Sequence, residues 1–194
     1  MNKEPKKFFK NWHFLDKRFS EKKFNYLFQS VLTSIALFLI FLFEDRFASG
    51  AILAGIGSTI ALIFLVPHSI ATHPRRVLGG HIAAILLAFI VFMVFNFIFG
   101  DFSNIPVNHL RIASVISIGF LIMIMGMTNT EHPPAAACLL GLILNGVNFE
   151  RIISILGAVI LLIVIRFILI NRLKNLIYYK RFFPPPTVIT SPVM

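Results

Sequence analysis

Charged residues are scarce in this sequence, and cysteine is almost absent. Only 13% of the 194 residues are Asp, Glu, Lys or Arg, which is about half the share usual in soluble domains. This scarcity excludes an ordinary soluble domain, whose surface is rich in charged side chains. Cys138 is the only cysteine, so no disulfide forms within the chain and the redox compartment stays undetermined.

Hydrophobic residues make up 57% of the chain and gather into runs of about twenty, the length that crosses a bilayer core about 30 Å thick. We predict an all-α, polytopic transmembrane helical bundle with five full spans and one short or re-entrant helix. The apolar stretch that follows Pro133-Pro134 is too short to cross alone. The full spans are expected at 24–43, 48–66, 77–99, 110–127 and 152–170, and the short helix within 135–147.

Basic residues concentrate at the two ends of the chain. Eight of the eighteen Lys and Arg lie in residues 1–23, and four more lie between Arg172 and Arg181. Because Lys and Arg are enriched on the cytoplasmic side of membrane proteins, we predict a basic cytoplasmic arm at 1–23 and a basic, Pro-rich cytoplasmic tail at 174–194. The expected location is the inner (plasma) membrane of a bacterium. No base-reading motif accompanies the charge, so nucleic acid is not an expected partner.

Small residues recur every fourth position in the second apolar run. Gly50, Ala54 and Ser58 share one helical face, and small side chains let helices approach closely in lipid. We therefore predict that this face packs against another helix, and that the protein forms a homo-oligomer through such faces.

The polar residues inside the chain fall into two stretches, 67–76 and 128–134. Proline is favoured in the first turn of a helix, so Pro74 and Pro133-Pro134 predict helix starts. Unpaired N–H groups and the positive end of the helix dipole make such starts suitable for anions. A purely structural interpretation, in which the polar side chains only cap helices, stays open. Glu131 favours a functional one, since an ionisable group near membrane depth is costly and usually functional.

Together these motifs resemble the HPP family of membrane proteins. The resemblance is carried by Gly57-Ser58-Thr59, Pro67-His68-Ser69, Pro74-Arg75, Gly79-Gly80-His81 and Glu131-His132-Pro133-Pro134. It covers about residues 48–146 and implies an HPP-type transmembrane domain at 24–173, in a family usually described with four spans. It also implies transport of nitrite, the best-supported role of some members. Ala135-Ala136-Ala137 and Cys138 depart from the run that usually follows the family's prolines.

Our expected function is the passage of a small inorganic anion, possibly nitrite, with His132 and Glu131 gating or relaying protons. A non-transporting structural membrane protein and a metal- or haem-binding one are the alternatives; His68, His73, His81, His132 and Cys138 are possible ligands. No nucleophile–base pair is clustered, so we expect neither an enzyme nor a bound cofactor. The candidate substrate-binding residues are His68, Ser69, Pro74, Arg75, His81, Asn129, Thr130, Glu131, His132, Pro133 and Pro134.

Overall fold

The computed structural model describes residues 17–44 and 49–177, and within them the chain is all-helical. Most of the predicted N-terminal arm and most of the predicted tail lie outside the described residues. In chain order the elements are α1 (Lys17–Glu44), α2 (Gly50–Leu65), η1 (Ile70–Thr72), α3 (Pro74–Phe99), η2 (Phe102–Asn104), α4 (Val107–Thr128), α5 (Ala135–Asn145) and α6 (Phe149–Leu169).

Four helices, α1, α3, α4 and α6, are long and apolar enough to cross a membrane. The expectation of five full spans is not confirmed, because α2 has only 16 residues and is about 24 Å long at 1.5 Å per residue. The helix after Pro133-Pro134 is short, as predicted, with 11 residues. Four long helices agree with the number of spans that the family resemblance implies.

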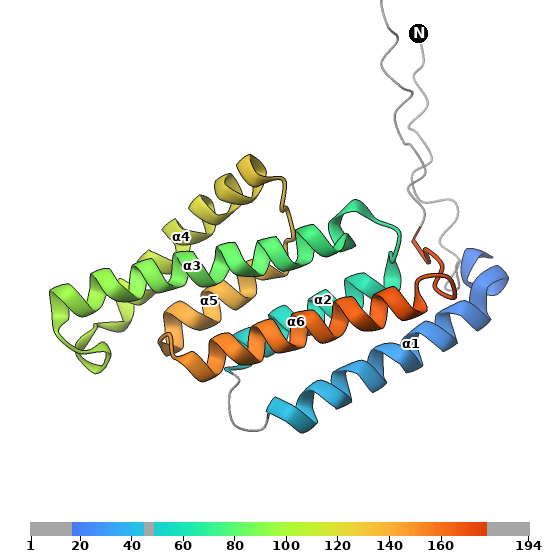
Figure 1. Ribbon diagram of the computed structural model, residues 1–194, viewed down its shortest axis with the longest axis horizontal. Coiled ribbons are helices and arrows are strands. Elements are labelled where there is room, and N and C mark those ends of the chain that lie inside the picture. The colour runs from blue at the N-terminus through green and yellow to red at the C-terminus, as the bar shows by residue number, and fades with distance from the viewer. Residues whose placement is uncertain (1–16, 45–48, 178–194) are drawn as a thin grey trace, which may run out of the picture.

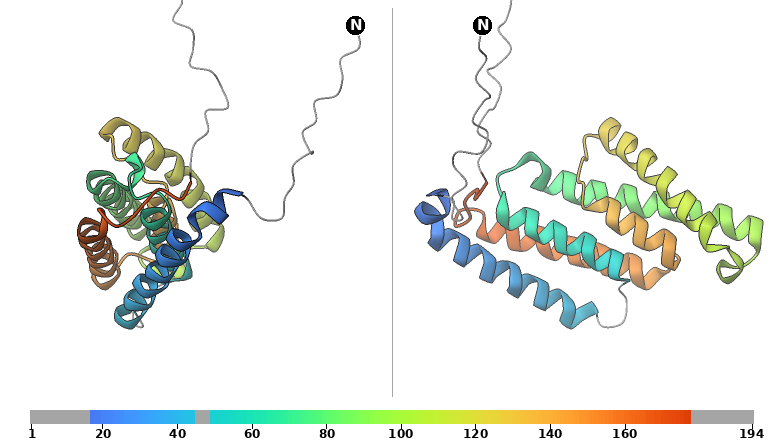
Figure 2. Two further views of the ribbon diagram at one scale, coloured as in Figure 1. Left: turned by 90° about the vertical axis from the view of Figure 1, so that its right-hand side faces the viewer. Right: turned by 180° about the vertical axis from the view of Figure 1, so that it is seen from behind.

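The shortest helix, α5, is the most enclosed one. It packs against α2, α3 and α4, whereas α6 contacts α2 and α3, and α1 lies at the edge against α2 and α6 (Figures 1 and 2). Six of the 11 residues of α5 are buried, while at most 28% of the most apolar window of any long helix is buried. The long helices therefore face lipid, and α5 sits inside the protein.

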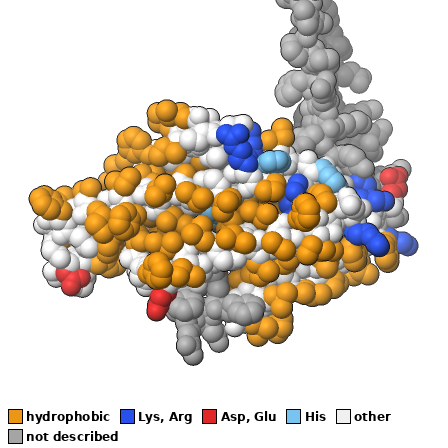
Figure 3. Space-filling view, viewed as in Figure 1, with side chains coloured by type: hydrophobic (Ala, Val, Ile, Leu, Met, Phe, Trp, Pro, Cys, Tyr) orange, Lys and Arg blue, Asp and Glu red, His pale blue; other side chains and the backbone are white. Residues whose placement is uncertain are grey.

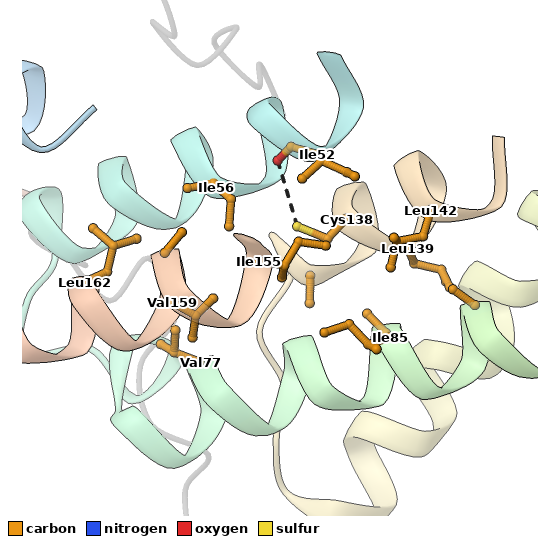
Figure 4. Close-up of a cluster of buried hydrophobic side chains, with 14 of the residues drawn as sticks. Ile52, Ile56, Val77, Ile85, Cys138, Leu139, Leu142, Ile155, Val159 and Leu162 are labelled. Atoms are coloured by element: carbon orange, nitrogen blue, oxygen red, sulfur yellow. Dashed lines mark hydrogen bonds between the residues drawn. The ribbon is translucent and has the colours of Figure 1, made fainter. Parts of the chain in front are cut away.

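The core lies where α2, α3, α5 and α6 converge (Figure 4). Ile56, Leu139 and Ile155 are fully buried there, and the thiol of Cys138 lies 3.9 Å from the carbonyl oxygen of Ile52. Lipid tails are as apolar as these side chains, so close packing rather than water exclusion holds the helices together. The outer surface is correspondingly apolar over most of the face shown in Figure 3.

Glycines create the closest helix contact, and they are not the ones expected. A Cβ atom on Gly55 would lie 2.6 Å from Cys138 Sγ, and one on Gly141 would lie 2.9 Å from the backbone nitrogen of Ile52. These glycines let α2 and α5 run antiparallel at short range. The predicted stripe is instead exposed at all three positions, Gly50, Ala54 and Ser58. The prediction that this face packs against another helix was therefore wrong for helices of the same chain. Periodicity identifies residues that share a face, but it does not identify which face is buried.

Both described ends of the chain lie at one end of the bundle, where α1 begins and α6 ends (Figure 1). Lys22 Nζ donates to the carbonyl oxygen of Asn175 at 2.8 Å, and the hydroxyl of Tyr26 donates to Leu176 at 3.2 Å. The buried amide of Gln29 donates to the carbonyl oxygen of Lys174 at 3.0 Å. We call this the basic end. Because both described ends lie here, the chain passes along the bundle an even number of times, with α5 counted as one pass. The side of the membrane that the basic end faces remains a prediction.

Candidate functional site

The residues between α4 and α5, 129–134, form a non-helical segment that dips from the basic end into the bundle. Asn129 ends α4 in the left-handed conformation, with φ 54° and ψ 47°, which Asn adopts more readily than most residues. The backbone N–H of Thr130 donates to the carbonyl oxygen of Met125 at 2.9 Å. This closes the end of α4 and turns the chain toward α3.

Two consecutive glycines of α3 make room for this segment. A Cβ atom on Gly80 would lie 2.9 Å from the Cβ of His132 and 3.0 Å from the carbonyl oxygen of Thr130. On Gly79, it would lie 2.4 Å from the methyl group of Thr130. The Gly79-Gly80-His81 motif therefore brings backbone against backbone at this point. Non-helical backbone at membrane depth is tolerated where protein surrounds it, as here.

His132 is fully buried at the bottom of the segment. Its Nδ1 lies 2.9 Å from the carbonyl oxygen of Ala71, and its Nε2 lies 3.0 Å from the hydroxyl of Thr59. A carbonyl oxygen only accepts, so Nδ1 carries a proton. The ring thereby ties η1 to the middle of α2.

The Thr59 hydroxyl has a second partner, which gives the ring two bonding states. It lies 3.0 Å from the carbonyl oxygen of Gly55, and one hydroxyl proton cannot serve both contacts. With a neutral His132, Thr59 donates to Nε2. With a protonated His132, Nε2 donates to Thr59 and the hydroxyl turns to Gly55. Both states keep the ring hydrogen-bonded, so this arrangement accommodates gain and loss of a proton.

A second buried imidazole, His81, lies beside the first. The ring centroids of His81 and His132 are 5.2 Å apart. His81 Nδ1 donates to the carbonyl oxygen of Val77 at 2.8 Å. Its Nε2 is buried and has no hydrogen-bond partner among the described residues. An unpartnered buried nitrogen is unusual in a protein interior.

Above these rings, at the basic end, a pocket of about 350 Å³ opens at the surface. It is lined by His68, Ser69, Ile70, His73, Arg75, Arg76, Asn129 and Arg166. Lys, Arg and His side chains gather in the right-hand half of the face in Figure 3. Within the described residues, Glu131 is the acid that contacts this group, 2.6 Å from Arg76. Three guanidinium groups against one carboxylate leave the pocket electropositive.

Each arginine is held by a separate contact. Arg75 Nη2 donates to the carbonyl oxygen of Thr128 at 3.2 Å, and Arg166 Nη2 donates to that of Pro67 at 2.7 Å. Arg76 also donates to the side chain of Asn129. The contacts to Pro67 and Thr128 are to neutral backbone groups, so the positive charges of Arg75 and Arg166 remain available to an anion.

The structure separates the sequence-predicted residues into those that line the pocket and those that lie around it. His68, Ser69, Arg75 and Asn129 line the pocket. The others lie around it: Thr130, Glu131, Pro133 and Pro134 belong to the dipping segment, Pro74 opens α3, and His81 and His132 lie in the interior.

Sequence reasoning missed Arg166, His73 and Arg76 as pocket residues. Arg76 and His73 belong to the polar stretch 67–76, so the sequence did contain a signal for them. Arg166 is an ionisable residue within the last apolar run, which is a signal of function. Nothing in the sequence connects it with the two polar stretches, because it reaches the pocket from α6.

The prolines mark helix starts as predicted, because α3 begins at Pro74 and α5 begins directly after Pro134. The N–H groups at these starts, however, are not free. The N–H groups of Ala135 and Ala136 donate to the carbonyl oxygens of His132 and Pro133 at 3.0 and 3.1 Å, and that of Arg76 donates to His73 at 2.8 Å. The backbone N–H groups are thus engaged within their own turns. Side chains, rather than free helix ends, supply the positive charge of this site.

Possible metal ligands do not cluster in the described part of the chain. There, no three His, Cys, Asp or Glu residues gather in a way that holds a metal ion. The closest group is the pair His81 and His132, and both ring nitrogens of His132 already have protein partners.

Comparison with known proteins identifies one family. The model of the family described as HPP, transmembrane region, matches residues 20–180. This match extends well beyond the residues that carry the motif resemblance, into α1 and past the end of α6. No curated protein and no solved structure matches the chain.

Proposed function

Because the chain belongs to the HPP transmembrane family, we propose that this integral membrane protein carries a small inorganic anion across the bilayer, with nitrite as the first substrate to test. The observation that carries the proposal is the electropositive pocket next to the non-helical segment 129–134, in which Thr130, His132 and Pro134 are buried. Interrupted helices with irregular backbone inside the protein are the usual setting of substrate sites in transporters. A non-transporting structural membrane protein does not require such a segment.

The pocket residues have distinct roles in this proposal. Arg75 and Arg166 attract the anion, since charges of one sign that line a cleft raise the local concentration of oppositely charged ions. Ser69 and Asn129 line the same hollow and offer polar groups for orientation. Arg76 is partly neutralised by Glu131, so it contributes less charge and instead fixes the start of the dipping segment.

His132 is the proposed gate beneath the pocket. A proton on the buried ring adds a positive charge below the arginines and reverses the Thr59 hydrogen bond. Either change alters how favourably an anion passes the dipping segment, residues 129–134. Glu131, at the surface of the same segment, is the proposed exchange point for that proton.

The test is flux into vesicles that contain the purified full-length protein. Nitrite, nitrate, formate and chloride are compared, and Arg166→Gln is compared with Arg111→Gln. Arg111 is an exposed arginine near the start of α4, away from the pocket. We expect flux of at least one anion above that of empty vesicles, reduced about tenfold by Arg166→Gln and little changed by Arg111→Gln; loss of one favourable charge contact of about 1.4 kcal/mol corresponds to that factor.

Arg166→Lys separates charge from structure in this test. It keeps the positive charge but changes the contact to Pro67, so substantial recovery of flux supports an electrostatic role. Flux no higher than in empty vesicles for all four anions, with folded and inserted protein, refutes the transport proposal.

A further inference from the structure

A second hollow lies beside the basic pocket, on the surface of α3 and α4. It is a groove of about 450 Å³ lined by Gly79, Ile82, Ala83, Leu86, Leu87, Ile90, Ile124, Thr128 and Thr130. Its wall is apolar except at one end, where the two threonines lie. Their hydroxyls are paired with each other at 2.7 Å, and that of Thr128 also donates to Ile124 at 2.8 Å. The groove therefore offers a hydrocarbon surface rather than unmet polar groups.

Arg75 lines the basic pocket and lies close to the polar end of the groove. On α3, Arg75 and Gly79 are four residues apart and share a helical face, and that face continues through Ala83 and Leu86 to Ile90. Arg75 also donates to the carbonyl oxygen of Thr128, the threonine at the polar end of the groove. One molecule with an anionic head and a hydrocarbon chain fits both hollows at once.

The length of the groove matches one leaflet of a bilayer. From Gly79 to Ile90 the helix rises about 16 Å, at 1.5 Å per residue, against about 15 Å for half of the hydrocarbon core. The polar end of the groove adjoins the basic end of the bundle, where lipid headgroups of that leaflet would lie. The apolar part then runs toward the middle of the membrane.

The charges around Arg75 select the headgroup. Arg75 and Arg166 have backbone oxygens as partners, and Glu131 is engaged with Arg76. A zwitterionic lipid brings an ammonium group toward these arginines, whereas an anionic lipid brings only its phosphate. Basic residues at the membrane surface favour anionic lipids for this reason.

We propose that an anionic glycerophospholipid binds here, with its phosphate on Arg75 and one acyl chain in the groove between α3 and α4. The lipid site shares Arg75 with the pocket of the proposed transport function. Lipid occupancy is measured without any flux, so the two proposals can fail independently. Arg166 lines the basic pocket but not the groove, so a lipid on Arg75 leaves that part of the pocket to a small anion.

The experiment places the full-length protein in vesicles of phosphatidylglycerol and phosphatidylcholine in equal amounts, with identical acyl chains. The protein is then extracted in mild detergent, and retained lipid is identified by native mass spectrometry. We expect the wild type to retain phosphatidylglycerol over phosphatidylcholine by about fivefold, the factor for one basic residue at a membrane surface.

Three variants assign the retention to the site. Arg75→Gln should bring the preference close to one, while Arg172→Gln, which removes an exposed charge just after α6, should leave it unchanged. Ala83→Phe fills the groove and should reduce retention of both lipids. If Ala83→Phe does not fold, the comparison of Arg75→Gln with Arg172→Gln still decides the headgroup assignment.

Four outcomes overturn the proposal. The wild type retains both lipids equally, or Arg172→Gln loses the preference as fully as Arg75→Gln, which indicates diffuse surface charge. Alternatively, the protein retains no lipid but binds inorganic phosphate in an Arg75-dependent way. Finally, a lipid-free dimer that Ala83→Phe dissociates would show that the groove is occupied by a second copy of the chain.

Discussion

Replacing His132 with glutamine or with alanine separates the two roles that the structure gives this side chain. The ring is buried, with Nδ1 bonded to the carbonyl oxygen of Ala71 and Nε2 to the hydroxyl of Thr59. A glutamine amide supplies one donor and one acceptor, so it replaces the bonds of the neutral ring without accepting a proton near neutral pH. Alanine supplies neither.

The expected loss of stability differs between the two variants. In His132→Ala the carbonyl oxygen of Ala71 loses its side-chain donor, and a cavity replaces the ring. One buried polar group left unpaired costs about 1–3 kcal/mol, and the missing side chain raises the total to about 2–5 kcal/mol. Thr59 contributes little to this sum, because its hydroxyl keeps the carbonyl oxygen of Gly55 as a partner. His132→Gln should cost less than about 1.5 kcal/mol, since volume and hydrogen bonds are largely kept.

Thermal unfolding in detergent measures the first role. For a domain of this size about 1 kcal/mol shifts the Tm by about 2–4 °C, so His132→Ala should unfold at least about 4 °C below the wild type. His132→Gln should lie between the two and closer to the wild type. An unchanged Tm for His132→Ala would refute the conclusion that the buried ring joins η1 to α2.

Flux between pH 5 and 8, which is roughly the range in which histidine changes charge, measures the second role. We expect wild-type flux to rise as the pH falls, because the protonated ring adds a positive charge on the anion's route. His132→Gln should lose this dependence. Nitrate serves as the control substrate, since its own charge does not change in that range. Full pH-dependent flux in a folded His132→Gln protein would refute the proton role while leaving the structural role intact.

One further prediction concerns the packing around this ring, and another concerns the two ends of the chain. Gly80→Ala should destabilise the protein by about 1–3 kcal/mol, the usual cost of overpacking, because the added methyl group meets the Cβ of His132 and a backbone oxygen. Gly57→Ala is the matched control, since a Cβ at Gly57 meets open space. This control should be neutral or stabilising in the same unfolding assay. A reporter that is active only in the cytoplasm should be active when fused to either end of the chain. The described ends meet through Lys22 and Asn175, and Lys and Arg mark the cytoplasmic side. Activity at one end alone would show an odd number of crossings.

The positions of the helices could be read from the sequence. In lipid every backbone polar group needs an internal partner, so a long apolar run has little choice but to form a helix. Five of the six expected runs correspond to helices within three residues at each end, and α5 begins at Ala135, directly after the predicted proline start. The first run was expected from residue 24, but α1 already begins at Lys17.

Whether a helix spans the membrane or lies within the protein was not determined by its composition. The second run is as apolar as its neighbours, yet it forms only the 16 residues of α2 and packs along α5. In a membrane, hydrophobicity does not separate the surface that faces lipid from the surface that faces other helices. The exposed face with Ala54 and Ser58, and the buried contacts of Gly55 and Gly141, follow from packing alone.

The sequence by itself determined the helices, the limits of all but α1 to within three residues, and the residue types around the site. These depend on local composition and on whether lipid or water surrounds the backbone. The polar stretches and their histidines could be singled out for the same reason. Only the tertiary structure decided that His132 is a buried ring with two partners, that Arg166 reaches the pocket from α6, and that the α5 N–H groups are already engaged. Each of these facts depends on which segments, far apart in the chain, come together in space. Hydrophobic periodicity carries no information about which segments do so.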